Sequence, residues 1–208
     1  MNLIEINMQK SFSPACERNQ DPILASINPI LKNAEHVLEI GSGTGQHAVH
    51  FAKNMPWVTW QCSDILSNLL GIQSWIDDTN LGNLPKPLEL DVSMNTVNQQ
   101  YDAVYSCNTL HIMSKDQVED FFSLIDIATK RTSDLIIYGP FNYLGKYTAD
   151  SNAEFDLWLK SQNPQSGIRD FEWIDSLAKQ NEFSLVNDKA MPANNRLLHW
   201  RRIGAINL

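Results

Sequence analysis

The chain has 208 residues, 43% of them hydrophobic, which is enough for one domain with a full apolar core. It carries 24 acidic residues against 16 basic ones, a formal net charge of −8. A broad nucleic-acid-binding surface needs Lys and Arg to neutralise phosphates, so this charge balance argues against nucleic acid as a partner.

The sequence also shows no pattern of export or membrane anchoring. No apolar run approaches the roughly 20 residues that cross a bilayer, and residues 1–10 mix polar side chains into their apolar ones. The three cysteines are far apart and in no metal-ligand spacing, which is typical of reduced thiols and predicts no metal site. We therefore expect a cytoplasmic protein with no metal and no membrane partner. No pattern predicts its oligomeric state.

Short apolar runs alternate with amphipathic stretches of helical period, the pattern of an α/β fold with a mainly parallel sheet. The predicted strands are His36–Ile40, Val58–Cys62, Leu88–Leu90, Asp102–Ser106, Leu135–Tyr138, Phe183–Asn187 and Leu197–Arg201. The predicted helices are one that starts at Asp21-Pro22 and ends or kinks at Pro29, then Gln46–Lys53, Ile65–Asp77, Lys115–Lys130, one from Ser151 through Trp158, and one from Asp170 through Ala178. Ser114 is a predicted N-cap, Ser151 to Glu154 has capping-box spacing, and Asp170 is a further candidate cap.

The last two predicted strands are joined only by Ala190 to Arg196. Parallel neighbours need a crossover of about a dozen residues, so these two strands should form an antiparallel hairpin. The expected fold is therefore α/β and Rossmann-like, with a seven-stranded, mostly parallel sheet that ends in a C-terminal antiparallel hairpin. This arrangement resembles the class I methyltransferase fold. We expect one domain over residues 1–208, with an N-terminal lid and helix over 1–34 and a substrate-capping insertion over 141–170.

A glycine-rich loop follows the first predicted strand and opens the next helix. Glycines at such a turn let the backbone bend sharply and let a ligand approach the main chain. The spacing is GxGxG, whereas dinucleotide-binding enzymes typically show GxGxxG. Glu39 lies two positions before the first glycine, where its carboxylate favours the cationic S-adenosylmethionine over a pyrophosphate. The residues expected to contact this cofactor here are Glu39, Gly41, Ser42, Gly43, Thr44, Gly45 and Gln46.

Two further acidic residues follow strands where a nucleoside needs them. Asp64 ends the second predicted strand about twenty residues after the glycine loop, where a carboxylate can accept the ribose hydroxyls. The alternative for Asp64 is an N-cap of the following helix. Asp91 ends the third strand, where it can contact the adenine amino group with Val92 beside the ring; the alternative is a simple turn aspartate.

The segment after the fourth predicted strand contains Asn108 and His111. Ligands of open α/β sheets bind beyond the carboxyl ends of the strands at the topological switch point, so both side chains should face the cofactor or the methyl acceptor. His111 is our first candidate for a general base. The alternative is that His111 only hydrogen-bonds a nearby backbone carbonyl.

The whole sequence resembles the family called methyltransferase-like protein twenty-six in animals. The stretches that carry this resemblance are Ser13–Ile23, Leu38–His47, Asn108–Ile112, Tyr138–Phe141, Ser151–Asn152 with Phe155–Asp156, Gly167–Asp170 and Met191–Asn195. The resemblance implies an S-adenosylmethionine-dependent methyltransferase fold and no particular substrate.

Residues outside the cofactor motif are candidates for further contacts. Arg18 lies in the N-terminal segment and can pair with the methionine carboxylate of the cofactor, the alternative being a surface arginine. Residues 141–169 contain several aromatic side chains that can shape an acceptor site or simply pack in the core. The residues expected to bind the acceptor are Phe141, Tyr143, Arg169, Asn194 and Asn195.

These observations predict methyl transfer from S-adenosylmethionine to a small molecule. If the acceptor must lose a proton, His111 is the first candidate base, with Asp156 and Tyr138 behind it. Three alternatives stay open: a cofactor-binding protein without catalysis, a nicotinamide-dependent reductase, and a protein, peptide or RNA methyltransferase. The negative net charge argues against RNA, and Glu39 with the GxGxG spacing argues against a nicotinamide cofactor.

Overall fold

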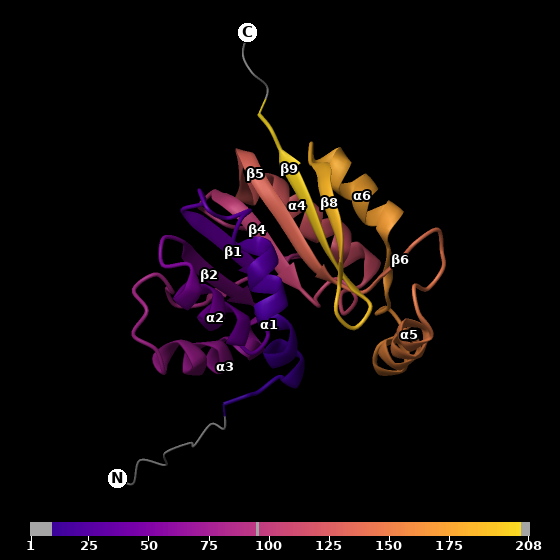
Figure 1. The fold of residues 1–208 in the computed structure, drawn as a ribbon, viewed down its shortest axis with the longest axis horizontal. Coiled ribbons are helices and arrows are strands. Elements are labelled where there is room, and N and C mark those ends of the chain that lie inside the picture. The colour runs from indigo at the N-terminus through magenta and orange to yellow at the C-terminus, as the bar shows by residue number, and fades with distance from the viewer. Residues whose placement is uncertain (1–9, 95, 205–208) are drawn as a thin grey trace.

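The computed structural model describes residues 10–94 and 96–204. A seven-stranded sheet runs through its middle in the order β3-β2-β1-β4-β5-β9-β8 (Figure 1). The strands are β1 His36–Ile40, β2 Thr59–Asp64, β3 Leu88–Glu89, β4 Tyr101–Cys107, β5 Thr129–Gly139, β8 Ser184–Met191 and β9 Asn195–Arg202. The strands β1 to β5 pair in parallel, and β9 pairs antiparallel with both β5 and β8. The predicted seven-stranded sheet with its C-terminal hairpin is confirmed.

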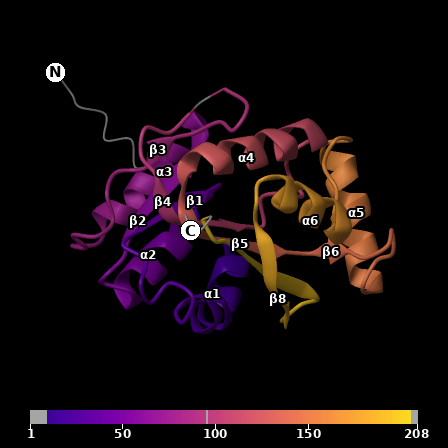
Figure 2. The same cartoon turned by 90° about the horizontal axis from the view of Figure 1, so that it is seen from above.

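Helices cover both faces of this sheet and bury two apolar cores. The helices are α1 Pro14–Ile27, α2 Gln46–Asn54, α3 Leu66–Asp77, α4 Lys115–Ala128, α5 Asp150–Gln162 and α6 Phe171–Gln180. Helices α1, α2 and α3 contribute to the core on one face, and α4 and α6 contribute to the core on the other. Figure 2 shows α4 and α6 on one side of the sheet and α1 and α2 on the opposite side. The sheet is therefore the central layer of three.

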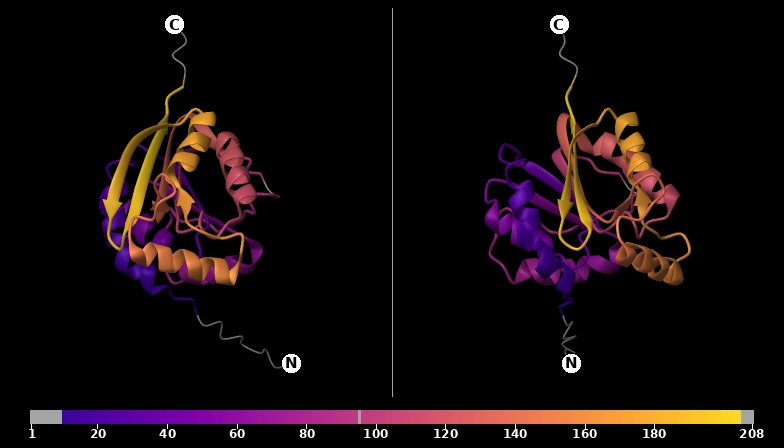
Figure 3. Two further views of the ribbon diagram at one scale, coloured as in Figure 1. Left: turned by 90° about the vertical axis from the view of Figure 1, so that its right-hand side faces the viewer. Right: turned by 45° about the vertical axis from the view of Figure 1, so that its right-hand side comes forward.

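Helix α5 belongs to neither core. It lies beside the carboxyl ends of the strands, close to the turn between β8 and β9 (Figure 3). Asn152 of α5 donates from Nδ2 to the carbonyl oxygen of Asn194 in that turn, over 3.2 Å. The segments before and after α5 form a small second sheet, in which β6 Phe141–Asn142 pairs in parallel with β7 Arg169–Asp170. This small sheet was not predicted, because strands of two residues leave no periodic pattern.

Several helix boundaries differ from the prediction. Helix α1 begins at Pro14 and not at Asp21-Pro22, because the Ser13 side chain accepts from the backbone N–H of Cys16 and Pro14 occupies the first turn. Its end at Ile27, just before Pro29, is as expected. Helix α5 begins at Asp150 with Ala149 at its N-cap, so the expected capping box from Ser151 is wrong.

The other two predicted caps have different outcomes. Ser114 caps α4 in a complete capping box with Gln117, as expected for the serine. Asp170 occupies the N-cap position of α6 but makes no capping hydrogen bond from its side chain. Strand β5 begins at Thr129, well before the expected Leu135, because Thr129 already pairs with Tyr101 of β4; the pairing then shifts register and continues from Ala103 and Asp134.

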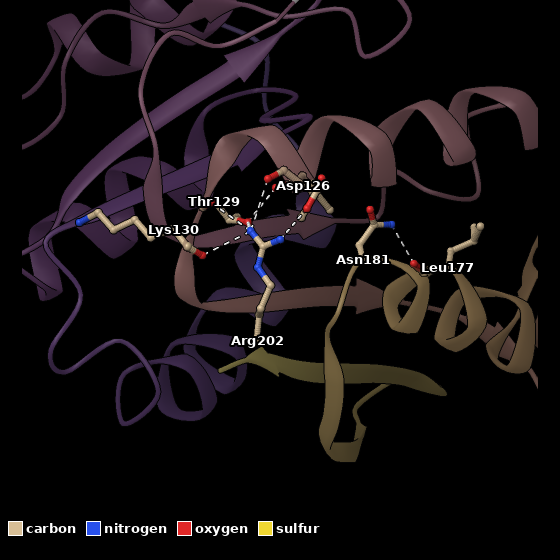
Figure 4. Close-up of polar contacts among 7 residues, drawn as sticks. Asp126, Thr129, Lys130, Leu177, Asn181 and Arg202 are labelled. Carbon is tan, nitrogen blue, oxygen red and sulfur yellow. Dashed lines mark hydrogen bonds and ion pairs between the residues drawn. The ribbon is translucent and has the colours of Figure 1, made fainter. Parts of the chain in front are cut away.

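A buried arginine closes the end of the sheet opposite to α5. Arg202 of β9 donates to the Asp126 carboxylate over 2.6 Å and to the carbonyl oxygens of Thr129 and Lys130 over 3.0 and 3.3 Å (Figure 4). Thr129 and Lys130 directly follow the last helical residue of α4, so the guanidinium lies near the C-terminal end of that helix, where a cation is favourable. Arg202 thus joins the last strand to the junction of α4 and β5. No helix of the described ranges is long and apolar enough to cross a membrane.

Candidate functional site

A cavity of about 1160 Å³ opens at the carboxyl ends of the central strands. It lies where the strand order reverses between β1 and β4, which is the usual ligand site of an open α/β sheet. The proposed cofactor residues that line it are Arg18, Glu39, Gly41, Ser42, Gly43, Thr44, Asp64, Asp91, Val92 and Asn108. The structure therefore brings together side chains from four strand ends and from α1.

Gly45 and Gln46 do not line this cavity, which corrects their assignment as cofactor contacts. A side chain at Gly45, where φ is +86°, would meet the backbone of Ile72 in α3 at 3.2 Å, so this glycine allows α2 and α3 to pack closely. The Gln46 Oε1 atom accepts from the backbone N–H of Ser13 over 2.5 Å and from the Thr44 hydroxyl over 3.0 Å. Gln46 thus ties the start of α1 to the glycine loop.

Gly43 has the opposite surroundings. Its φ is +58°, and a side chain placed on it would meet no described atom within 4 Å. The loop thus presents bare backbone to the cavity at this position. A conformation that favours glycine beside open space is what a closely approaching ligand requires.

Glu39 is a buried acid at the end of β1. Its Oε2 atom accepts from Trp60 Nε1 over 2.9 Å. Burial raises the pKa of the Glu39 carboxyl to about 7, although hydrogen bonds from Trp60 and Ser42 act in the opposite direction. A cation bound beside Glu39 would restore the full negative charge, because an opposite charge favours the ionised form.

Asp64 connects the end of β2 to the glycine loop. Its Oδ2 atom accepts from the Gly43 backbone N–H over 2.7 Å, and its Oδ1 atom accepts from Ile65 N and Asn68 Nδ2, each over 2.8 Å. The alternative role as an N-cap is wrong, because Ile65 occupies the N-cap of α3 and no side chain caps that helix. Oδ2 retains one lone pair for a hydroxyl group.

Asp91 and Val92 form the third part of this end of the cavity, just beyond β3. The Asp91 carboxylate accepts from the backbone N–H of Ser93 over 3.0 Å. The turn role of Asp91 is therefore present, and the side chain lines the cavity as well. Val92 is 9% exposed and belongs to the core that α4 and α6 cover. It also lines the cavity, so its side chain can contact one face of an adenine ring.

Asn108 and His111 converge at the other end of the cavity. A methyl group placed on Gly139, at the end of β5, would lie 3.6 Å from Asn108 Oδ1 and 3.8 Å from His111 Nδ1. Burial, and secondly the charge of Arg169, lower the pKa of His111 to about 4. Its imidazole is therefore neutral near pH 7. No hydrogen bond from this ring to a described residue is present, whereas the alternative role required one to a backbone carbonyl.

The loop that carries His111 is fixed from outside the cavity by Arg169. The Arg169 Nε atom donates to the Leu110 carbonyl over 3.2 Å, and its Nη2 atom donates to the Met113 carbonyl. The backbone N–H of Gly167 donates to the His111 carbonyl over 2.9 Å. Arg169 is buried and does not line the main cavity, so it is a positioning residue and not the acceptor contact that we expected.

Asp156 also has a structural role, which corrects its assignment as a candidate base. It accepts from Tyr147 Oη over 2.7 Å, from Lys160 Nζ over 2.5 Å and from Ile168 N over 2.7 Å. Burial raises its pKa, but the hydrogen bonds together outweigh that effect, so the pKa lies below the usual value. This carboxylate holds α5 against β7 and does not line the main cavity.

Of the other predicted site residues, some line the cavity and some do not. Tyr138 lines the cavity, but burial raises its pKa to about 12, so its hydroxyl keeps its proton and is a poor base near pH 7. Phe141 is buried in the core, and Tyr143 donates to Asp188 Oδ2 over 2.8 Å; neither lines the cavity. The two residues proposed from the β8–β9 turn, Asn194 and Asn195, both line it.

Among the cavity residues to which the sequence analysis gave no individual role are Asn19, His47, Asn152 and Phe155. His47 Nε2 lies 2.7 Å from Asn19 Oδ1, and burial lowers the pKa of His47 to about 4. Phe155 meets the His111 ring edge to face, with centroids 5.3 Å apart. All four lie inside the stretches that carry the family resemblance, which is the signal that could have identified them.

A model of the family described as "Protein of unknown function (DUF938)" matches residues 10–202. The chain belongs to this family. Among solved structures, an O-methyltransferase family protein from Burkholderia thailandensis is 16% identical with a TM-score of 0.81, over 92% of this chain and 58% of its own. Mitomycin 7-O-methyltransferase is 17% identical with a TM-score of 0.79, over 90% and 54%. Human N-acetylserotonin methyltransferase, solved in complex with S-adenosylmethionine, is 14% identical with a TM-score of 0.78, over 92% and 53%.

The chain thus spans between half and two thirds of the length of these three solved chains. At such low identity the likeness shows the fold. The structure of this DUF938 protein is a class I methyltransferase fold.

The buried Glu39 predicts a pH-dependent cost to stability. The folded-state pKa of about 7 lies above the ordinary value of 4.5, so the unfolded chain releases this proton first as the pH rises. The contribution of Glu39 to the free energy of unfolding therefore falls between pH 4.5 and about 7. Glu39→Gln should raise the free energy of unfolding by roughly 3 kcal/mol at pH 8, at about 1.4 kcal/mol per pKa unit, and by little at pH 4.5.

Urea unfolding of the ligand-free protein and the variant at both pH values measures this difference. Glu89→Gln, at an exposed position outside the cavity, is the matched control and should show no such pH dependence. An equal effect of Glu39→Gln at both pH values would contradict the buried, partly protonated carboxyl.

Proposed function

We propose that this protein is an S-adenosylmethionine-dependent methyltransferase that acts on a small-molecule acceptor. The observation that carries the proposal is the convergence of Glu39, Gly43 and Asp64 on one cavity at the switch point of a class I methyltransferase fold. Each of the three supplies something that the cofactor requires: an acid for its cationic end, bare backbone for close approach, and an acceptor for a ribose hydroxyl. Residues of α5 and of the β8–β9 turn form part of the cavity wall, which favours a small acceptor over a polymer.

The chemistry of the donor set fits this cofactor. Arg18 is exposed, lines the cavity and has no ion-pair partner among the described residues, so its guanidinium is available for the methionine carboxylate. Glu39 suits the amino group and Asp64 the ribose. Asp91 and Val92 suit the adenine amino group and ring face. When bound, S-adenosylmethionine supplies a methyl group that its sulfonium has already activated.

The protein then has to position the acceptor and take its proton. Arg169 donates to backbone carbonyls on both sides of His111, and the Gly167 N–H donates to the His111 carbonyl, so the backbone that carries the imidazole is held in place. A neutral His111 can accept the proton that a hydroxyl or amine loses as it takes the methyl group. Phe155 packs against the ring and keeps water from that side. Alignment of this kind is worth roughly 7–11 kcal/mol of a reaction barrier.

The first prediction of the proposed function concerns the identity of the cofactor. Calorimetry should show binding of S-adenosylmethionine and of its demethylated product, S-adenosylhomocysteine. Asp64→Ala should weaken this binding by at least about 2 kcal/mol, since it removes a charge-assisted hydrogen bond and frees the Gly43 N–H. Glu89→Ala, also at the end of a sheet strand but outside the cavity, should leave affinity unchanged. Binding of NAD, with no binding of S-adenosylmethionine or S-adenosylhomocysteine, would contradict the proposal.

The second prediction tests Arg18. Arg18→Ala should weaken binding of S-adenosylhomocysteine about tenfold, because the exposed guanidinium then no longer pairs with the ligand carboxylate. Binding of methylthioadenosine, which lacks the amino-acid end, should be the same in the wild type and the variant. Equal losses for the two ligands would show that Arg18 supports the fold of α1 and not the carboxylate.

The third prediction concerns the base. His111→Asn should reduce turnover by about 10²–10⁴-fold with little change in cofactor affinity. Because the His111 pKa is about 4, the acid limb of the wild-type rate profile should lie near that pH and not near 6.5. Transfer of a labelled methyl group from S-adenosylmethionine into a metabolite extract supplies the acceptor for this assay. His50→Asn, outside the cavity, is the control. A variant that loses cofactor affinity and turnover together would make His111 a binding residue.

A further inference from the structure

We infer that the acceptor is an uncharged molecule that presents O–H or N–H donors to the end of the cavity formed by Asn108, Asn152 and Asn195. The inference rests on the proposed function and names the chemical class of its substrate. Three features carry it: the absence of charged side chains at this end among the residues that the structure describes, the contacts of two amide groups, and the hydrogen-bonded turn that carries one of them.

Charge is unevenly distributed around the cavity. The charged side chains that line it within the described residues are Arg18, Glu39, Asp64 and Asp91. All of them come from α1 or from the ends of β1, β2 and β3, where the proposed cofactor binds. The opposite end has polar but uncharged side chains, and its histidine is neutral near pH 7. A charged acceptor group placed there would lose part of its hydration without gaining a counter-ion, which is unfavourable.

The amide groups of two asparagines are oriented by backbone carbonyls. The Asn195 Nδ2 atom donates to the carbonyls of Pro192 and Ala193 over 3.2 and 3.3 Å. The Asn152 Nδ2 atom donates to the Asn194 carbonyl over 3.2 Å. A backbone carbonyl can only accept, so the nitrogen must face it in each case. Both residues line the cavity, where a side-chain carbonyl oxygen can accept from a hydrogen-bond donor of a ligand.

The turn that carries Asn195 is strained and held in place. Ala193 and Asn194 both have φ of +56°, and the Asn195 N–H donates to the Pro192 carbonyl over 3.4 Å, as in a type I′ hairpin turn. This conformation is unfavourable for alanine. The Asn194 side chain donates to Ser151 Oγ over 3.1 Å, so α5 and the turn brace each other. Rigid acceptor groups discriminate more strongly than mobile ones, because they cannot turn to suit a different ligand.

The third acceptor group lies beside the candidate base. Asn108 Oδ1 and His111 Nδ1 approach the same point above Gly139, at 3.6 and 3.8 Å. The two atoms are therefore near each other, and both residues line the cavity, so a hydroxyl or neutral amine bound beside them can donate to either atom. Apolar side chains of Ile112, Met113 and Phe155 complete this end of the cavity and suit the carbon frame of such a molecule.

The test uses five probes on one benzene ring: phenol, aniline, anisole, benzoate and benzylammonium. Saturation of the protein with S-adenosylhomocysteine is established first by calorimetry, so that a failure of cofactor binding is separated from a failure of this inference. Ligand-observed NMR titration at pH 7.5 then gives the affinity of each probe. Phenol and aniline should bind at least tenfold tighter than the two charged probes and tighter than anisole, which lacks a donor. Tighter binding of a charged probe, or no preference among the five, would overturn the inference.

A charge swap provides the second arm. Asp, like Asn, tolerates the left-handed backbone at residue 108, where φ is +55°. Asn108→Asp should therefore keep the fold and raise the affinity for benzylammonium at least tenfold, by giving it a counter-ion. Asn187→Asp, an identical change on the exposed strand β8, should leave all five affinities unchanged. If Asn108→Asp leaves benzylammonium binding unchanged in the folded, cofactor-loaded protein, Asn108 does not face the acceptor and the inference fails.

Discussion

The hydrogen bond from the Gly43 backbone to the Asp64 carboxylate, at 2.7 Å, is the contact on which the site depends. It joins the loop after β1 to the end of β2, and the same carboxylate accepts from Ile65 at the N-cap of α3 and from Asn68 in its first turn. A loop with three glycines at positive φ would otherwise be conformationally free. Because the bond is charge-assisted, it fixes the loop before any ligand arrives. The rest of the cavity is built around that fixed edge.

Burial shifts the pKa values of three ionisable side chains that line the cavity. It raises the pKa of Glu39 and lowers that of His47 and His111, so all three groups tend toward their neutral forms. A neutral acid beside an arriving cation can ionise again, whereas a neutral imidazole can accept a proton. One physical cause, desolvation, therefore prepares both a binding group and a candidate base. The buried groups disfavour the folded state at some pH values, which is a common cost of a preorganised site.

Much of this arrangement could be predicted from local sequence patterns. The strands appear as apolar runs, and the parallel α/β rule places the ends of β1, β2 and β3 together, so Glu39, the glycine loop and Asp64 were found correctly as one cluster. What failed depended on contacts between distant segments. Asp156 and Arg169 resemble site residues in sequence, but Ile168 and Tyr147 bind the first and the carbonyls of Leu110 and Met113 bind the second. His47 was missed because only the packing of α1 on α2 shows which helix face meets the cavity.

The position of β9 between β5 and β8 has a consequence for biosynthesis. The strand β9 fills the place between β5 and β8, and it is the last strand in the described chain. During synthesis, β5 and β8 therefore have no partner at this place until β9 has been made. Until then β5, which is buried from Leu135 to Gly139, has an open edge with unpaired backbone groups. Such an edge is prone to associate with other strands. This edge of β5 is therefore open to such association from the time that β5 leaves the ribosome until β9 does.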